Sequence, residues 1–556
     1  MINEGRYEVL IDRLQNLVRL LWQWVVPNLN AFTTNKQPIV WVLGIVVGVG
    51  AAVLAVAFRE LIGLVQYLWS GEHSEIYLSA VREAPWYAIL LAPALGGVVV
   101  GGLLHFVSKT KRAGGVADVI EARHIGGRVL GFKDAVLSAL ITIISLGSGN
   151  SAGREGPAIH LGASFSSVIF RRFSLPDSAT RTLLAAGAAS AVSASFNAPI
   201  AGVLFAHEVI LGHYSMRAFV PIVLSSVAGT VVARNWFGES LTFNIPVYEI
   251  TSYLEFPAFF ALGVVCALVA ILFQLSLFSL DYLAKSVNLP LWVRPPIGGL
   301  VVGFIGVFYP EILGIGYETT NDAIWGRVPI MLMVILILLK IFATAVTYAS
   351  RFGGGVFSPA LLLGALTGGV FGVIATGVFP ELASDQNVYA ILGMGAIAAT
   401  VIGAPISTTV IVFELTGGYA LSIALLFTIA VSHGINQAIH GRSFFQWQLE
   451  MRGLHVRDGP YKAILAHLTV QDFMVKVDLD DDEITLSELK MIGDYPTLSK
   501  FTSMDLALQL FDTSGHSKLP VIDGQHPDVI IAWAEYSNAI NLINNRLIET
   551  QHEEHN

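Results

Sequence analysis

Two short segments of this chain each occur twice, in the same order and in corresponding places. The first is a glycine-rich turn followed by Pro-Ala-x-x-Leu-Gly-Ala, which covers residues 153–163 and again residues 353–365. The second is Ala-Pro-Ile with a glutamate nine residues after its proline, at residues 198–208 and 404–414. In every copy the proline stands where a helix can begin. The repetition predicts two halves of similar fold, each with helices that begin at such turns.

The composition places these segments in a membrane. The 556 residues are 54% hydrophobic and only 13% charged, well below the charged fraction of a soluble protein. A membrane-spanning helix needs roughly 20 apolar residues. Long or nearly charge-free stretches include Ile39–Ala57, Tyr87–Val107, Ala258–Leu280, Pro329–Ala345 and Leu421–Ser432. We expect ten or more membrane helices in the lipid bilayer, several of them tilted or ending halfway. Broken helices in corresponding positions of two repeats mark the substrate site of transport proteins.

The chain ends and the charged loops indicate the orientation. Residues 1–38 contain an amphipathic stretch, Arg6–Val26, which fits an interfacial helix on the cytoplasmic face better than a signal peptide. Basic residues gather at 109–133, whereas the loop at 72–83 is mostly acidic. The positive-inside rule then predicts cytoplasmic termini, in a plasma or inner membrane. The single cysteine, Cys266, excludes disulfides and cysteine-ligated metal sites.

The last part of the chain reads as soluble. We interpret 451–466 as a linker, 467–546 as a small α/β cytosolic domain and 547–556 as a disordered tail. The predicted elements of the domain are a helix at 505–514, strands at 519–523 and 529–533, and a helix at 534–546. This order resembles one CBS module, with Leu468–Val475 as the stub of another. Such modules often bind adenine nucleotides, but the usual Ser/Thr-x-x-Asp is replaced by Trp533–Asn538. A packing or dimer-contact domain is therefore favoured.

The repeated turns predict the chemistry of the site. A helix that begins inside the membrane leaves its first N–H groups unpaired, with the positive end of its dipole exposed. An anion is the natural partner of such an end, and glycines allow the backbone to approach it closely. Gly153–Pro157 and Gly353–Pro359 each open such a helix. Two turns that meet at mid-membrane would bind an anion without a fixed cation, which suits conduction because the ion can leave again.

Two charged residues stand in the first of these turns. Glu155 places a carboxylate where the positive helix ends converge. When ionised it can occupy an anion position and block the path, and when protonated it can swing away; the alternative is a structural carboxylate satisfied by the N–H groups. Arg154 either attracts anions or binds a loop carbonyl.

With these motifs the chain resembles the CLC family of chloride channels and chloride/proton antiporters. The markers are Gly147–Gly149 leading to Gly153–Pro157, then Phe196–Pro199, then Gly354–Pro359. The resemblance covers the membrane domain, 39–450, as two repeats at about 39–237 and 254–445. It implies an all-α fold of two inverted repeats with tilted and broken helices, and a homodimer with one anion pathway per subunit. It makes Glu155 the gating glutamate, and it implies anion-binding positions at Gly114, Gly115, Arg154, Gly156, Val356, Phe357 and Phe445.

The chain departs from the family pattern at three positions. Gly114 stands where the family has a serine, and Phe445 stands where it has a tyrosine, with Tyr461 a poorer match. Val209 occupies the position at which antiporters carry a proton-relaying glutamate. Fewer hydroxyl donors weaken anion binding, and no inner carboxylate is left at that position to receive protons. These changes favour a channel or a weakly proton-coupled carrier; the alternative is a chloride/proton antiporter in which Glu208 or His207 relays protons.

Other classes of protein explain the sequence less well. An intramembrane metalloprotease would need His-Glu-x-x-His, but His207 and His213 are six residues apart. A magnesium channel would need carboxylates along its path rather than helix N-termini. We therefore expect no enzyme activity, no metal, no cofactor and no nucleic acid partner. Lys340 is expected to pair or to reach the interface, with a contribution to the field along the pathway as the alternative. His160 is expected to pack in a helix, and Glu208 and Glu414 are expected to share a structural role.

Overall fold

The structure of the protein is a computed structural model. It describes residues 4–34, 36–74, 77–124, 130–173, 175–239, 243, 250–287, 289–416, 421–454, 468–476, 495–522 and 529–555. The predicted linker at 451–466 lies mostly outside these residues, as does Tyr461.

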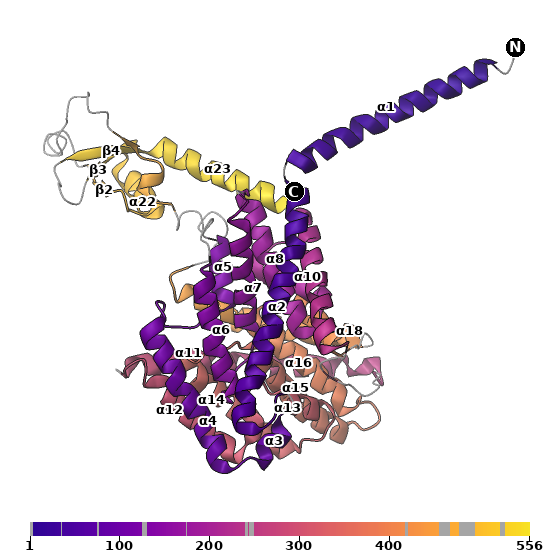
Figure 1. Ribbon diagram of the computed structural model, residues 1–556, viewed down its shortest axis with the longest axis vertical. Helices are drawn as coiled ribbons and strands as arrows, with labels where there is room; N and C mark the ends of the chain where they lie inside the picture. Colours follow the sequence, from indigo (N-terminus) through magenta and orange to yellow (C-terminus); the bar gives the residue numbers. More distant parts are fainter. Residues whose placement is uncertain are drawn as a thin grey trace.

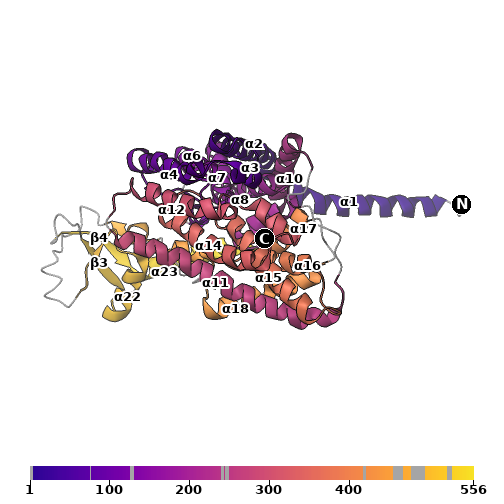
Figure 2. The same cartoon turned by 90° about the horizontal axis from the view of Figure 1, so that it is seen from below.

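The membrane domain consists of helices in two sets. The first set is α2 (Gln37–Ser70), α3 (Leu78–Glu83), α4 (Trp86–Gly102), η1 (Leu103–Val107), α5 (Val116–His124), α6 (Phe132–Gly147), α7 (Glu155–Phe170), α8 (Asp177–Phe196), α9 (Pro199–Phe205), η2 (Ala206–Leu211) and α10 (Met216–Phe237). The second set is η3 (Tyr253–Glu255), α11 (Phe256–Ser286), α12 (Arg294–Phe308), η4 (Pro310–Ile312), α13 (Tyr317–Ile324), α14 (Ile330–Ala349), α15 (Phe357–Val378), α16 (Gln386–Ile402), α17 (Pro405–Thr416), α18 (Ser422–Ile439) and α19 (Phe444–Glu450). Figure 2 shows the two sets on opposite sides of the domain.

Contacts between the two sets are reciprocal, as two inverted repeats require. On α4 and α12, a Cβ on Gly97 would lie 2.5 Å from the Pro295 carbonyl oxygen, and one on Gly299 would lie 2.1 Å from the Pro93 carbonyl oxygen. Only glycine permits this close approach of the two backbones. The predicted pair of similar halves is therefore present.

Seven of the described helices are long and apolar enough to cross a membrane. They are Gln37–Ser70, Trp86–Val107, Met216–Phe237, Phe256–Ser286, Ile330–Ala349, Phe357–Val378 and Ser422–Glu450. With the shorter apolar helices, they agree with the expectation of ten or more membrane helices, several of which end halfway. Four further apolar segments have only 10–17 residues, Pro199–Leu211, Arg294–Phe308, Gln386–Ile402 and Pro405–Thr416. Proline at the first turn of α9 and of α12 marks where such short helices begin.

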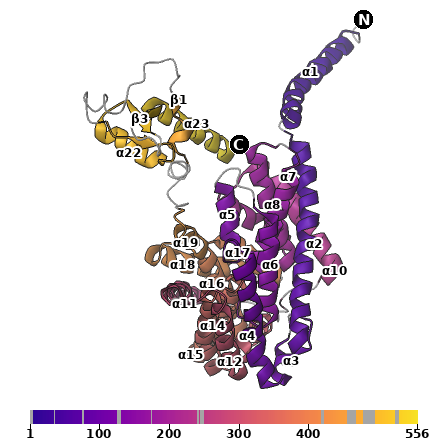
Figure 3. The same ribbon diagram turned by 60° about the vertical axis from the view of Figure 1, so that its left-hand side comes forward.

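The N-terminal helix and the C-terminal domain lie at one end of the membrane domain, opposite α3 (Figures 1 and 3). α1 (Glu4–Thr34) confirms the helix predicted at 6–26 and extends away from the other helices (Figure 1). The C-terminal domain comprises η7 (Val470–Asp472), β1 (Val475–Lys476), β2 (Leu498–Ser499), α22 (Met504–Ser514), β3 (Lys518–Ile522), β4 (Ile530–Glu535) and α23 (Tyr536–His555).

The C-terminal domain follows the predicted order of strands and helices, in a four-stranded sheet of order β1-β4-β3-β2. β3 pairs with β2 in parallel and with β4 antiparallel, while β1 pairs antiparallel with β4. Phe511 of α22 and Ile543 of α23 pack in the core with Val521 of β3. The disordered tail predicted from residue 547 was wrong, because α23 continues to His555. That segment contains no proline or glycine to end a helix.

Candidate functional site

The two repeated glycine-rich turns meet inside the membrane domain. The N–H of Gly153 donates to the Gly355 carbonyl oxygen at 2.7 Å, and the N–H of Gly355 donates to the Gly153 carbonyl oxygen at 2.6 Å. α7 and α15 begin directly after these turns. Gly354 has φ of 153°, and a Cβ there would lie 2.4 Å from the Ala152 Cβ, so only glycine fits. The structure thus brings together two helix N-termini that lie far apart in the sequence.

Glu155, the first residue of α7, is buried with its carboxylate between the two turns. Oε1 accepts hydrogen bonds from the hydroxyl of Ser358 and, at 3.4 Å, from that of Tyr317. Oε2 is buried without a hydrogen-bond partner among the described residues, and a Cβ on Gly153 would lie 2.3 Å from it. The carboxylate therefore fills the space at which both helix N-termini are directed.

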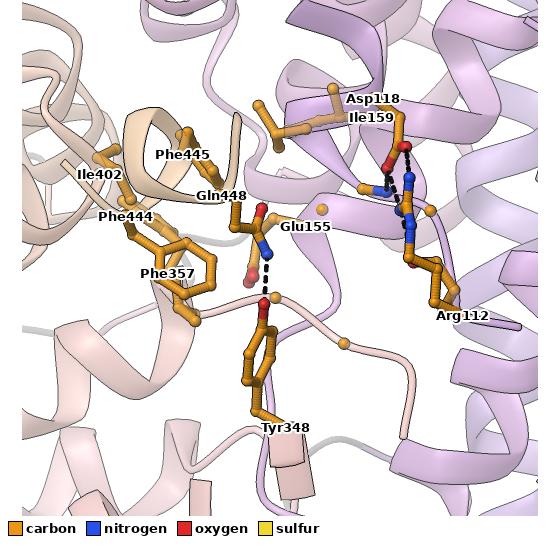
Figure 4. Close-up of a pocket in the computed structure, with 18 of the residues that line it drawn as sticks. Arg112, Asp118, Glu155, Ile159, Tyr348, Phe357, Ile402, Phe444, Phe445 and Gln448 are labelled. Carbon is orange, nitrogen blue, oxygen red and sulfur yellow. Dashed lines mark hydrogen bonds and ion pairs between the residues drawn. The ribbon is translucent and has the colours of Figure 1, made fainter. Parts of the chain in front are cut away.

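One cavity extends from Glu155 toward the end of α19 (Figure 4). Six further predicted site residues line it: Gly114, Gly115, Gly156, Val356, Phe357 and Phe445. The first N–H groups of a helix have no acceptor within the helix. In the described part of the chain, the N–H groups of Gly156 and Phe357 have no backbone acceptor. They are therefore available to a ligand in the cavity. This end of the cavity can thus receive a small anion without any cationic side chain.

The loop before α5 carries two of the predicted anion-binding positions, Gly114 and Gly115. Gly114 and Gly115 do line the cavity, but their N–H groups are already used. Gly114 donates to the Ser138 hydroxyl at 2.9 Å, and Gly115 donates to the Asp118 carboxylate at 2.8 Å. Side chains of the same protein thus occupy both backbone N–H groups. Anion binding at Gly114 and Gly115 stays a prediction, which their place in the cavity wall allows.

His160 explains why residue 114 is a glycine. A Cβ on Gly114 would lie 2.5 Å from the His160 ring. His160 is buried on α7, and its Nδ1 has no hydrogen-bond partner among the described residues. The imidazole occupies the space that a serine side chain at 114 would need. His160 is thus a packed helix residue, as predicted, but one that contacts the cavity loop.

Arg154 is not directed into the cavity. Its guanidinium donates to the Ser195 carbonyl oxygen at 2.7 Å and lies over the Tyr317 ring, 5.5 Å from the ring centre. Of the two roles predicted for Arg154, the structure has the binding of a carbonyl, here one in the last turn of α8 rather than in a loop. Arg154 is not among the residues that line the cavity, so its predicted place in the anion-binding set stays a prediction.

Three arginines line the other end of the cavity, Arg112, Arg351 and Arg452. Each is paired with acidic side chains. Arg112 pairs with Asp118, and Arg452 lies 3.1 Å from both Asp118 and Glu121. Arg351 lies 3.3 Å from Asp281.

These ion pairs fix the charge of Asp118, which is on α5 and outside the membrane-spanning segments. Burial would raise the pKa of the Asp118 carboxyl, but the hydrogen bond and charge of Arg112, with the charge of Arg452, hold that pKa well below its usual range. The arginine-lined end of the cavity therefore combines positive groups with ionised carboxylates. It can attract an anion without binding it strongly.

Ser358, Tyr317, Tyr348 and Gln448 are among the residues of this region that the sequence analysis missed. Ser358 belongs to the second glycine-rich turn, and the proline that follows it could have drawn attention to its place in the first helical turn. Tyr317 is 162 residues from Glu155, and no spacing in the sequence links the two. Tyr348 and Gln448 are likewise joined only by the fold, through a hydrogen bond of 2.9 Å (Figure 4).

The two symmetric glutamates exchange contacts between the repeats. Glu414 accepts from the N–H groups of Ile200 and Ala201 at 3.1 and 2.7 Å. Glu208 accepts in the same way from Ile406 and Ser407, at 3.0 and 2.7 Å. Each carboxylate caps the short helix of the other half. The predicted shared structural role has a direct geometric basis.

The remaining polar residues have local contacts. Val209 is partly buried against the main core, and the Nδ1 of the neighbouring His207 lies 3.2 Å from the His213 carbonyl oxygen. Lys340 was expected to pair or to reach the interface, but it has no acidic partner among the described residues and does not lie at the surface. It is buried and donates to the carbonyls of Ile312 and Gly314. The part of the chain that the structure describes holds no group of three or more His, Cys, Asp or Glu side chains suited to a metal ion.

The fold and this site define a class: an integral membrane protein of two inverted repeats that transports anions past paired helix N-termini. The comparison of sequences identifies the family within this class. Residues 96–437 match the family described as voltage gated chloride channel, so the chain belongs to the CLC family.

Known relatives agree with this assignment. The chain is 30% identical over 384 residues to a ClcB-like chloride channel protein of Ralstonia nicotianae, an alignment that covers 68% of this chain and 89% of that protein. Among solved structures, a slow cyanobacterial Cl⁻/H⁺ antiporter superposes with a TM-score of 0.67 at 22% identity, over 76% of this chain and 99% of the other. A eukaryotic CLC transporter superposes with a TM-score of 0.64 at 17% identity, over 90% and 97%. The structural likenesses show the shared fold.

Proposed function

We propose that the protein conducts chloride through this cavity with the Glu155 carboxylate as the gate. One observation carries the proposal: the carboxylate lies between two helix N-termini joined by the Gly153–Gly355 bridge. An ionised carboxylate there takes the place of an anion. When Glu155 moves away, the free N–H groups of α7 and α15 remain for chloride. The anion-binding residues are Gly156, Val356 and Phe357, with Phe445 as an apolar wall.

We favour a channel or a weakly proton-coupled carrier. Val209 offers no carboxylate on the inner side, and the arginines of the cavity are neutralised by acidic partners. An anion held by weak, neutral donors can leave quickly, which conduction requires. The ClcB-like relative carries the name of a chloride channel protein.

Chloride/proton exchange is the second candidate. The observation that favours it is His207, whose Nε2 is buried without a partner among the described residues, two residues from Val209. An imidazole in that place could carry a proton toward Glu155. One structural neighbour is a Cl⁻/H⁺ antiporter.

A reversal-potential measurement separates the two candidates. Purified protein in a lipid bilayer is placed under crossed chloride and pH gradients. A channel gives a reversal potential set by chloride alone, whereas an exchanger gives one shifted by both gradients. In the same assay, Glu155→Gln should remove gating and its pH dependence; unchanged gating would exclude Glu155 as the gate, and absence of anion current in the wild type would exclude the proposed function.

The assembly and orientation are proposals too. We infer a homodimer with one pathway per subunit, in a plasma or inner membrane with both termini in the cytoplasm. α1 and the C-terminal domain lie at the same end of the membrane domain, and the acidic residue Glu83 lies on α3 at the opposite end (Figures 1 and 3). The C-terminal domain is proposed as a CBS-like packing or dimer-contact module that needs no nucleotide.

A further inference from the structure

Two polar side chains form a pair on the wall of the anion cavity. Tyr348 lies near the end of α14 and Gln448 near the end of α19, and both line the cavity with Glu155. Gln448 Nε2 donates to the Tyr348 hydroxyl oxygen at 2.9 Å (Figure 4). Phe444 packs edge-on against the Tyr348 ring with 5.7 Å between ring centres. The phenol is thereby held in place by two contacts from α19.

The hydrogen bond from Gln448 determines what the phenol can still do. A tyrosine hydroxyl has one proton to donate. Its oxygen already accepts from Gln448, and the described residues provide no acceptor for its own proton. Tyr348 is half-buried in the cavity wall, so an acceptor that enters the cavity is a suitable partner for this proton. A small anion is such an acceptor.

Charge around the pair points to the same ligand. Arg351 follows Tyr348 by three residues and Arg452 follows Gln448 by four, and both line the cavity. Their carboxylate partners, Asp281 for Arg351 and Asp118 and Glu121 for Arg452, offset much of the positive charge. The arginines can draw an anion to this end of the cavity, while a neutral donor is needed to bind it closely.

We propose that the Tyr348 hydroxyl, positioned by Gln448, is an anion ligand between the arginines and Glu155, and that it helps to set affinity and selectivity among small monovalent anions. This inference rests on the proposed function of the cavity. It assigns a donor to the arginine-lined end, whereas the helix N-termini serve the Glu155 end.

The test compares three proteins in chloride flux from liposomes. Tyr348→Phe keeps the ring and removes the donor, so the chloride concentration for half-maximal flux should rise about tenfold, as expected for a hydrogen bond to a charged group. Gln448→Met frees the phenol without removing its proton and should cause a smaller rise. Tyr87→Phe is the matched control, because Tyr87 is exposed on α4 outside the cavity; its half-maximal concentration should equal that of the wild type.

The outcomes separate this inference from the proposed function. Wild-type flux with an unchanged half-maximal concentration in Tyr348→Phe overturns the inference alone, whereas a wild type without chloride flux overturns the proposed function. A crystal of the wild-type protein in bromide gives a second readout that does not depend on a variant. Anomalous density within hydrogen-bonding distance of the Tyr348 oxygen supports the inference, and density confined to the starts of α7 and α15 overturns it.

Discussion

The Glu155 carboxylate is held by two hydroxyl groups that come from the other half of the chain. Ser358 and Tyr317 both contact Oε1, and they also contact each other at 3.3 Å. A gate must leave its closed position readily, so each of these contacts sets how often it opens. The side chains that tune the gate are therefore distinct from those proposed to bind chloride.

Tyr317→Phe tests this at the level of one hydroxyl. The hydrogen bond from the Tyr317 hydroxyl to Glu155 is long, 3.4 Å. Its loss should destabilise the closed position of the Glu155 carboxylate by about 0.5–1 kcal/mol and raise chloride flux about two- to fivefold. The phenyl ring remains beneath Arg154, which preserves the packing there. Flux in liposomes measures the effect, with Tyr87→Phe again as the control. A decrease in flux, or no change, would contradict a retaining role for Tyr317.

A second prediction concerns the packing of Gly114 against the His160 ring. A side chain at 114 collides with the imidazole, so Gly114→Ser should lower the free energy of unfolding by about 1–3 kcal/mol. Removing the ring by His160→Ala creates space for the serine. The free energy of unfolding of the double variant should then fall by less than the sum of the decreases in the two single variants. Thermal unfolding followed by intrinsic fluorescence gives the three values.

The neighbouring Gly115 provides the control for this pair. A Cβ on Gly115 would have nothing within 4 Å, so Gly115→Ser should leave the unfolding temperature close to that of the wild type. Strictly additive losses in the double variant would mean that His160 does not account for the glycine at 114.

Helix starts were the elements best predicted from the sequence. The glycine-rich turns and the prolines gave the beginnings of α7, α9, α15 and α17 because proline and glycine have strong local preferences at those places. The occupied N–H groups of Gly114 and Gly115 could not be predicted in this way. Their acceptors, Ser138 and Asp118, depend on how neighbouring helices pack.

The exchange of caps by Glu208 and Glu414 makes a prediction at the scale of helices. Each carboxylate satisfies two N–H groups at the start of the opposite short helix. Replacing either one by alanine should lower the free energy of unfolding by about 1–2 kcal/mol, the usual cost of losing a helix cap. The two losses should be similar because the contacts are symmetric. Thermal unfolding of the purified protein measures them.

Glu381→Ala is a suitable control, since Glu381 is exposed in the turn after α15; its unfolding temperature should not change. The same variants separate a structural role from proton transfer. Glu208→Gln should leave any proton movement of the wild type unaltered, and a selective loss of proton movement would show that Glu208 relays protons.

At the scale of the whole molecule, one residue, Arg452, links the two repeats and also precedes the C-terminal domain in the chain. Arg452 follows α19, the last helix of the second repeat, and pairs with Asp118 and Glu121 on α5 of the first. The soluble domain follows it in the chain. The order of elements in that domain could be predicted from local patterns, but this ion-pair cluster could not, because its members lie more than 300 residues apart.

Arg452→Gln should loosen this junction and lower the free energy of unfolding by about 1–2 kcal/mol, as expected for partly buried ion pairs. The loss should depend on pH with a definite sign. Because the folded-state pKa of Asp118 is lowered, its ion pairs stabilise the protein fully above the unfolded-state pKa of about 3.9 and less as the pH falls further. Because wild type and variant share the same unfolded state, their difference should be constant from pH 8 to pH 5. It should become smaller only when the pH falls below about 3.9 toward the lowered folded-state pKa of Asp118. Arg442→Gln, which breaks only a local pair with Glu450, should cost less at every pH; an equal cost for both variants would show that the Arg452 junction does not join the two repeats.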